Sequence, residues 1–206
     1  MCQFVETICI KDGKARNLSY HVERMNRTIR KFFPDMTPVT ETNLLGDIPT
    51  IGDLQKARVV YSEQGITERT FAPYTTRHIQ SIAIVEDNSI SYTWKSTDRS
   101  TLLKQREKAS WADEVMIVKD GCITDTSYTN LCFYDGCEWI TPDTPLLPGT
   151  MRQYLLDEGQ IKERRIRIED LSKYQKVSLI NAMMELGDLC LSTLIFAARK
   201  EIIGNK

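Results

Sequence analysis

Three Asp-Gly pairs constrain the fold of this chain more than any other feature of its sequence. Each pair separates two short runs rich in strand-forming residues, and the pairs are Asp12-Gly13, Asp120-Gly121 and Asp135-Gly136. Asp-Gly is favoured in two-residue hairpin turns because both central positions take positive φ angles. The chain should therefore contain three such hairpins, joining Val5–Ile10 to Lys14–Leu18, Glu114–Val118 to Gly121–Thr124, and Asn130–Tyr134 to Cys137–Thr141.

Helices are predicted between these hairpins. Apolar residues recur at helical spacing from Leu18 to Phe32, and Pro34 ends the pattern. Further helices are expected after Asp98 and over Met151–Glu158, and a further hairpin from Ala57–Tyr61 to the segment around Phe71. Strands mixed with helices indicate an α/β (α+β) protein. A change of pattern near Pro73–Arg77 suggests a small N-terminal domain over 1–76 and a larger C-terminal domain over 77–206, led by a strand over Ser81–Trp94.

Composition excludes several classes of function. The 206 residues carry a formal net charge of -1, which indicates neither a nucleic-acid partner nor an anionic membrane surface. No apolar run approaches the roughly twenty residues that span a bilayer, and Glu6 and Lys11 come too early for a signal peptide. Six cysteines without a CxxC pair, and only two histidines, argue against a metal site. We therefore expect a cytoplasmic protein with reduced thiols and no metal.

Two residues could carry chemistry at strand ends. Lys95 ends an alternating run from Ile90, and a partly desolvated lysine there would have a lowered pKa and a free amine for Schiff-base formation. Asp125 follows a short strand, where a carboxylate can hold a pyridinium nitrogen in its protonated form. The more ordinary interpretations are a solvated edge lysine and an Asx turn.

Two further elements suit a phosphate group. The run Leu147-Pro148-Gly149-Thr150-Met151-Arg152 enters a predicted helix, whose first backbone N–H groups would bind an anion. Arg24 lies one helical turn from His21 and could either reach a phosphate or pair with a surface carboxylate. The sequence contains no GxGxxG, GxxxxGK[ST] or GxSxG motif, so dinucleotide, P-loop and esterase functions lack their usual support.

In their order and spacing, these elements resemble the class IV aminotransferase family, the fold-type IV pyridoxal-phosphate enzymes. The matching elements are Phe4-Val5-Glu6-Thr7, His21-Val22-Glu23-Arg24-Met25, Lys95-Ser96-Thr97-Asp98-Arg99, Asp113-Glu114, Asp120-Gly121, the run from Ile123 to Leu131, Thr141-Pro142, Leu147 to Arg152, and Asn181-Ala182. The resemblance implies a two-domain D-amino-acid aminotransferase-like fold with pyridoxal 5'-phosphate between the domains. It also implies a homodimer that acts on a small amino substrate.

The resemblance assigns a role to each matching residue. Lys95 would carry the cofactor and move protons, Asp125 would keep the pyridine nitrogen charged, and the remaining cofactor contacts would come from Arg24, Thr150, Met151, Asn181 and Ala182. The chain departs from the family at four places: Asp125 stands for the usual Glu, Ser100 for an aromatic residue, Ala182 for a hydroxyl residue, and the usual N-terminal segment with its Y-G-D-G loop is not found.

Two reactions of this family compete, and a third possibility is cofactor binding without catalysis. 4-Amino-4-deoxychorismate lyase releases pyruvate and leaves 4-aminobenzoate for folate synthesis, whereas a D-amino-acid or branched-chain transaminase exchanges an amino group. Arg99, Ser100 and Arg69, which loosely resembles an R-G-Y element of lyases, favour the lyase slightly. Arg69 and Arg99 are therefore predicted to bind substrate carboxylates.

Overall fold

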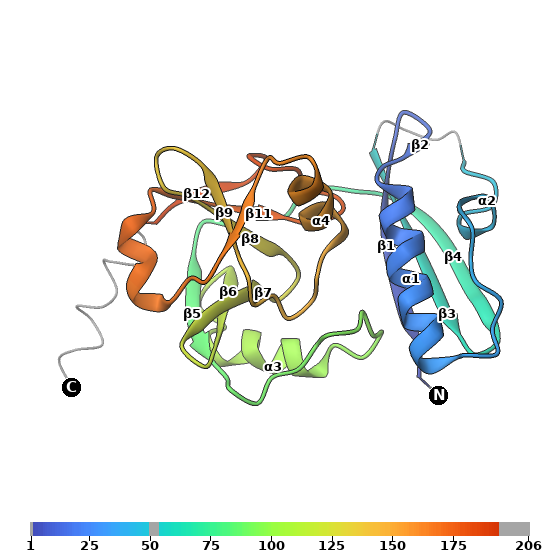
Figure 1. The fold of residues 1–206 in the computed structure, drawn as a ribbon, viewed down its shortest axis with the longest axis horizontal. Coiled ribbons are helices and arrows are strands. Elements are labelled where there is room, and N and C mark those ends of the chain that lie inside the picture. Colours follow the sequence, from blue (N-terminus) through green and yellow to red (C-terminus); the bar gives the residue numbers. More distant parts are fainter. Residues whose placement is uncertain (1, 50–53, 194–206) are drawn as a thin grey trace. The chain divides into compact units, whose positions relative to one another are not determined.

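The computed structural model describes residues 2–49 and 54–193. The chain forms two compact units (Figure 1). Unit 1 comprises Met1–Thr76 with Trp94–Arg99, and unit 2 comprises Arg77–Thr93 with Ser100–Lys206. The boundary predicted at residue 76 did not anticipate that Trp94–Arg99, which carries Lys95, belongs to unit 1.

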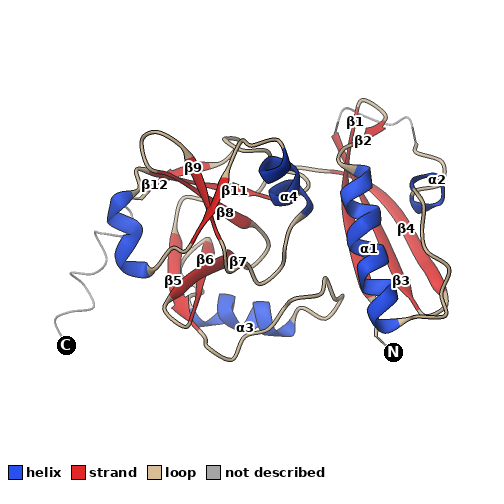
Figure 2. Cartoon of the chain, viewed as in Figure 1, coloured by secondary structure: helices blue, strands red, loops and turns tan. Residues whose placement is uncertain are grey.

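Unit 1 is a four-stranded antiparallel sheet with one long helix, α1 (Leu18–Phe32), packed on it (Figure 2). The strands lie in the order β2-β1-β3-β4 and have the bounds β2 Lys14–Ala15, β1 Phe4–Lys11, β3 Leu54–Ser62 and β4 Gly65–Pro73. A short helix, α2, covers Glu41–Leu44. Met25 and Ile29 of α1 are buried against Ile8 and Val59 of the sheet. The predicted helix is confirmed. Its apolar residues have the spacing of the helix face that packs on the sheet.

The described residues of unit 2 form two sheets. The first has the order β5-β6-β7 and the second the order β10-β9-β8-β11-β12. The strands are β5 Ile82–Glu86, β6 Glu114–Lys119, β7 Cys122–Thr126, β8 Asn130–Tyr134, β9 Trp139–Pro142, β10 Lys162–Arg164, β11 Lys176–Ile180 and β12 Cys190–Ser192. The helices are α3 Ser100–Lys108, α4 Thr150–Asp157 and the 3₁₀ helix η1 Ile168–Lys173. None of the described helices is long and apolar enough to cross a membrane.

Two of the predicted two-residue turns are confirmed. Asp12 and Gly13 have φ angles of 51° and 72°, and Asp120 and Gly121 have the same values. These are the positive φ angles that type I′ turns require, so β1 pairs with β2 and β6 with β7 in antiparallel hairpins. The strand after the first turn is shorter than predicted, because helix α1 already begins at Leu18.

The third predicted hairpin is present, since β8 and β9 pair in antiparallel fashion. Its two-residue turn and the length of one further strand were predicted wrongly. The pair Asp135-Gly136 lies in a longer loop, because Oδ1 of Asp135 accepts hydrogen bonds from the amides of Cys137 and Glu138 and β9 starts only at Trp139. The strand predicted over Ser81–Trp94 ends at Glu86. The side chain of Asp87 binds the backbone and hydroxyl of Ser89 and turns the chain there, so Ile90 to Lys95 is not a strand.

Candidate functional site

Lys95 is held by the edge of β1 in unit 1, and not by a strand of its own. Its carbonyl accepts a hydrogen bond from the amide of Val5 at 2.9 Å, and the amide of Thr97 donates to the carbonyl of Gln3 at 3.0 Å. These bonds flank a bridge between Phe4 and Ser96. The Lys95 residue is partly buried. The backbone of β1 therefore fixes a lysine that the sequence alone placed at a strand end.

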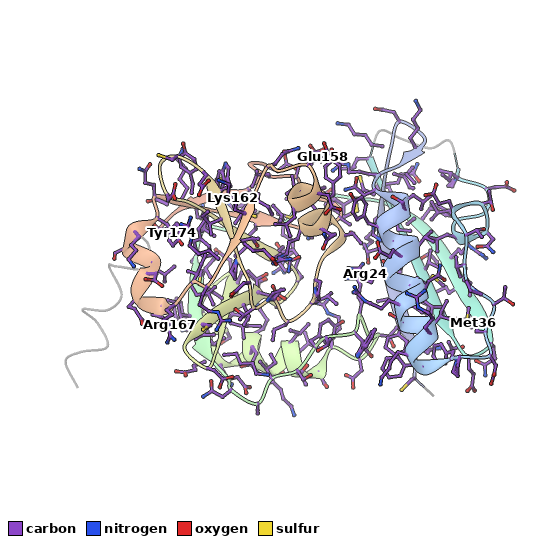
Figure 3. All side chains as sticks on the ribbon, viewed as in Figure 1. Arg24, Met36, Glu158, Lys162, Arg167 and Tyr174 are labelled. Carbon is purple, nitrogen blue, oxygen red and sulfur yellow. The ribbon has the colours of Figure 1, made fainter. Side chains whose placement is uncertain are left out.

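In the same unit, the buried carboxylate of Glu6 binds two side chains of α1. The Nδ1 atom of His21 lies 2.6 Å from Oε2 of Glu6. Arg24 donates from Nε to Oε1 at 2.9 Å and from Nη2 to Oε2 at 2.6 Å. His21 and Arg24 meet one partner because residues three apart share a helix face. Figure 3 marks Arg24 on this helix. Arg24 is buried, so its alternative role as a surface ion pair is wrong.

The charges of this cluster set its protonation states. Burial alone would raise the pKa of Glu6, but the charge of Arg24 and hydrogen bonds from His21 and Arg24 outweigh it and lower that pKa to about 2. The pKa of His21 is lowered by burial and by the positive charges of Arg24 and Lys95, although Glu6 acts the other way. At neutral pH His21 is therefore an uncharged imidazole. Its Nδ1 carries the proton, because an ionised carboxylate can only accept.

Asp125 is the corresponding buried carboxylate of unit 2. It lies in β7 with 5% of its surface exposed. Its Oδ1 accepts a hydrogen bond from Nδ2 of Asn130 at 2.8 Å, and its Oδ2 accepts one from the amide of Leu147 at 2.9 Å. Burial raises the pKa of Asp125 to about 7, although these bonds and the charge of Arg152 oppose the rise. Such a carboxyl is poised to ionise beside a cationic partner.

The predicted phosphate-binding backbone also lies in unit 2. Helix α4 begins at Thr150 after Gly149, its N-cap, and both Thr150 and Met151 are buried. Asn181 and Ala182 follow β11 in a tight turn, in which the backbones of Asn181 and Met184 exchange two hydrogen bonds. No described residue accepts a hydrogen bond from the amide of Ala182. Ile180, the residue before this turn, pairs with Asn130 of β8. The turn therefore belongs to the same part of unit 2 as Asp125.

The two arginines predicted to bind substrate have different surroundings in unit 1. Arg69 of β4 donates from Nε to the carbonyl of Leu44 at 3.0 Å and from Nη2 to that of Asn43 at 2.8 Å. It therefore satisfies carbonyls at the C-terminal end of α2. Arg99 is exposed at the end of the segment that carries Lys95. The substrate-binding role of both residues stays a prediction.

Sequence reasoning missed several residues of these clusters. Glu6 and Asn130 were quoted only as parts of motifs, yet each binds a predicted site residue directly. Arg152 is buried in α4, where Nη2 donates to the carbonyl of Pro142 and to Glu163, and no described residue accepts a hydrogen bond from its Nε. A charged residue inside the apolar run of β1 was the one signal that could have revealed Glu6.

The chain belongs to the class IV aminotransferase family, since the family model described as amino-transferase class IV matches residues 3–189. An uncharacterised protein of Haemophilus influenzae is 36% identical over 187 residues, which are 89% of this chain and 98% of that protein. A protein of Schizosaccharomyces pombe, provisionally named an aminodeoxychorismate lyase, is 29% identical over 209 residues, covering 92% of this chain and 88% of that one.

Solved structures of the family share the fold. A crystal structure of a provisionally named 4-amino-4-deoxychorismate lyase from Haemophilus somnus is 34% identical, with a TM-score of 0.79 over 90% of this chain and 98% of that one. A hypothetical aminotransferase of Mycobacterium tuberculosis in its PLP-bound form has a TM-score of 0.74 at 18% identity, over 98% of this chain and 87% of that one. The predicted fold-type IV, D-amino-acid aminotransferase-like architecture is thereby confirmed.

Proposed function

We propose that this protein is a pyridoxal-phosphate-dependent enzyme of the 4-amino-4-deoxychorismate lyase type. The proposal rests chiefly on the 34% identity to the Haemophilus somnus protein over nearly its whole length. The residues present fit the cofactor, because the chain offers a lysine amine, a buried arginine and a buried carboxyl group with a pKa near 7. When bound, pyridoxal phosphate supplies an electron sink that stabilises negative charge at the α carbon of an amino substrate.

Lys95 is the proposed base and attachment point. The backbone bonds with β1 anchor the base of this side chain, and its amine would take and return a proton at the substrate α carbon. The neighbouring His21 is uncharged and the charge of Arg24 is compensated by Glu6. The cluster of Glu6, His21 and Arg24 thus adds little net charge near the lysine. Any contact of Arg24 with a phosphate group would come from N–H groups of its guanidinium other than those that bind Glu6.

Asp125 is the proposed partner of the pyridine nitrogen. A carboxyl with a pKa near 7 would ionise next to a pyridinium cation, because an opposite charge favours the charged form. The backbone amides of Thr150, Met151 and Ala182 are the proposed phosphate contacts, with Asn181 shaping the turn that presents Ala182. The proposal therefore draws on residues of both units.

The reaction is tested with aminodeoxychorismate, generated in situ from chorismate and glutamine or ammonia. We expect equal amounts of pyruvate and 4-aminobenzoate without any amino acceptor. Lys95→Ala should abolish both products, and Glu68→Gln at an exposed ion pair of β4 should leave them unchanged. Conversion of the bound cofactor to its amine form by ordinary amino acids, with no lyase products, would replace the lyase by a transaminase.

Transamination stays the competing activity for one structural reason. Arg69 was part of the sequence argument for a lyase. Two nitrogens of its guanidinium already bind carbonyls of α2, which weakens that argument. Cofactor binding without catalysis is the remaining alternative, and yellow protein that yields neither set of products would support it.

A homodimer is a separate part of the proposal. It is motivated by the family, whose active sites borrow a loop from a partner subunit. Light scattering on the purified protein should give twice the chain mass of 23.7 kDa. A monomer with full activity would contradict the proposed exchange of loops.

A further inference from the structure

The side chain of Asn130 connects the two halves of the proposed cofactor site in unit 2. From the start of β8, its Nδ2 donates to Oδ1 of Asp125 at 2.8 Å and to the carbonyl of Leu147 at 2.9 Å. The carbonyl of Leu147 can only accept a hydrogen bond, so the amide nitrogen of Asn130 must face it, and the same nitrogen donates to Asp125. The amide oxygen of Asn130 consequently points the other way, toward Gly149.

Gly149 is required by the side chain of Asn130 and not by its own backbone. A Cβ atom at residue 149 would lie 2.0 Å from Oδ1 of Asn130, far inside van der Waals contact. The φ and ψ angles of Gly149, -75° and 150°, are ordinary for any L residue. Asn130 therefore packs directly against the N-cap of α4 while it binds Asp125.

We propose that Asn130 is a positioning residue that fixes the Asp125 carboxylate and the start of α4 relative to one another. This inference rests on the proposed function, in which Asp125 meets the cofactor ring and the amides of Thr150 and Met151 meet its phosphate. A rigid cofactor needs both contacts at one set spacing, and a single side chain that touches both supports maintains that spacing. The main-chain pairing of Asn130 with Ile180 adds the turn at Ala182 to the same support.

The charge on Asp125 depends on a small set of groups. Arg152 of α4 acts on it as a positive charge, and the amides of Leu146 and Leu147 and the side chain of Asn130 donate to it. Asn130→Ala would remove one hydrogen bond to the charged form and leave the others in place. Such bonds are worth about 1.5–3 kcal/mol, so the pKa of Asp125 should rise by about one to two.

The first test is carbon NMR of the Asp125 carboxyl in cofactor-free protein. Asn130→Ala should raise its pKa by about one or more. The matched control is Asn26→Ala in unit 1, whose side chain binds only the backbone of Val39 and should leave that pKa unchanged. If Asn130→Ala does not fold, the isosteric Asn130→Asp should give a carboxyl pair of which one pKa is strongly raised. An unchanged pKa of Asp125 in Asn130→Ala, or a carboxyl pair in Asn130→Asp in which neither pKa is raised, overturns the proposal.

The second test uses the contact with Gly149. Gly149→Ala should lower the urea midpoint strongly in the wild type and only slightly in the Asn130→Ala background, because the atom that it would strike is gone. Equal losses in the two backgrounds would show that Asn130 does not hold this loop. Titration with pyridoxal phosphate should show at least a roughly tenfold weaker affinity for Asn130→Ala. If the wild type itself binds no cofactor, the proposed function fails, while the carboxyl titration still decides whether Asn130 holds Asp125.

Discussion

Replacing Glu6 by Gln should destabilise the protein severely although it preserves the shape of the side chain. The Glu6 side chain is fully buried and that of Arg24 is 8% exposed, and two hydrogen bonds join them. Glu6→Gln removes the negative charge and leaves a buried guanidinium without compensation. Removing one partner of a buried pair costs about 3–5 kcal/mol of the free energy of unfolding.

The same carboxylate sets an acid limit to stability. The pKa of Glu6 falls from 4.5 to about 2 on folding, which corresponds to roughly 3 kcal/mol. Because the folded pKa is the lower one, this stabilisation is fully present above pH 4.5 and is lost as the pH falls toward 2. Wild-type protein should therefore lose roughly 3 kcal/mol more than Glu6→Gln between pH 5 and pH 2.

Urea unfolding of the cofactor-free protein at several pH values measures both effects. The control is Glu68→Gln, which breaks the exposed pair of Glu68 with Arg58 and should cost at most about 1 kcal/mol. A Glu6→Gln variant as stable as the wild type, with the same dependence on acid, would falsify the reasoning about this cluster.

The pair also determines how Arg24 must be tested. Arg24→Ala should weaken cofactor binding by about 1.5–3 kcal/mol if Arg24 binds the phosphate. The single variant would also leave Glu6 buried without its cation, so unfolding could be mistaken for lost affinity. Comparing the wild type with Glu6→Gln/Arg24→Ala removes that ambiguity, because neither protein leaves one member of the buried pair without its partner. Equal cofactor affinities for the two would return Arg24 to a purely structural role.

Two further predictions concern Asp125 and Arg69. The pKa of Asp125 is higher in the folded protein, so its stabilisation is present below pH 3.8 and lost as the pH rises to about 7; cofactor-free wild type should therefore lose roughly 4 kcal/mol relative to Asp125→Asn over this range in urea titrations. Arg69→Ala should raise KM more than it lowers kcat in steady-state kinetics, as expected for lost ground-state binding, and a changed kcat alone would contradict the substrate-binding role.

Much of the fold could be predicted from local sequence signals. Asp12-Gly13 and Asp120-Gly121 specify their turns because few dipeptides tolerate two positive φ angles. Helix α1 could be predicted because its apolar spacing matches its buried face. The two-residue turn predicted at Asp135-Gly136 was wrong, because the Asp135 side chain accepts hydrogen bonds from two backbone amides and the loop is longer. That choice depends on local hydrogen bonds that the dipeptide alone does not specify.

The candidate site was harder to predict because long-range pairing builds it. Lys95 was expected at the end of a strand, but it is bonded to β1, some ninety positions earlier in the chain. Glu6 lies 18 residues before Arg24, and Asn130 lies 17 residues before Leu147 although only five after Asp125. The resemblance to a family supplied the roles of Lys95 and Asp125, but the side chains that support them became visible only in the folded chain.

Reduction with borohydride, followed by mass spectrometry of the digested protein, tests the central claim most directly. The purified protein should be yellow, and reduction should fix one cofactor per chain on Lys95. Lys95→Ala should lose the fixed cofactor but retain some non-covalent binding, because the proposed phosphate contacts remain. A reduced cofactor on another lysine, or on none in protein saturated with pyridoxal phosphate, would contradict the account.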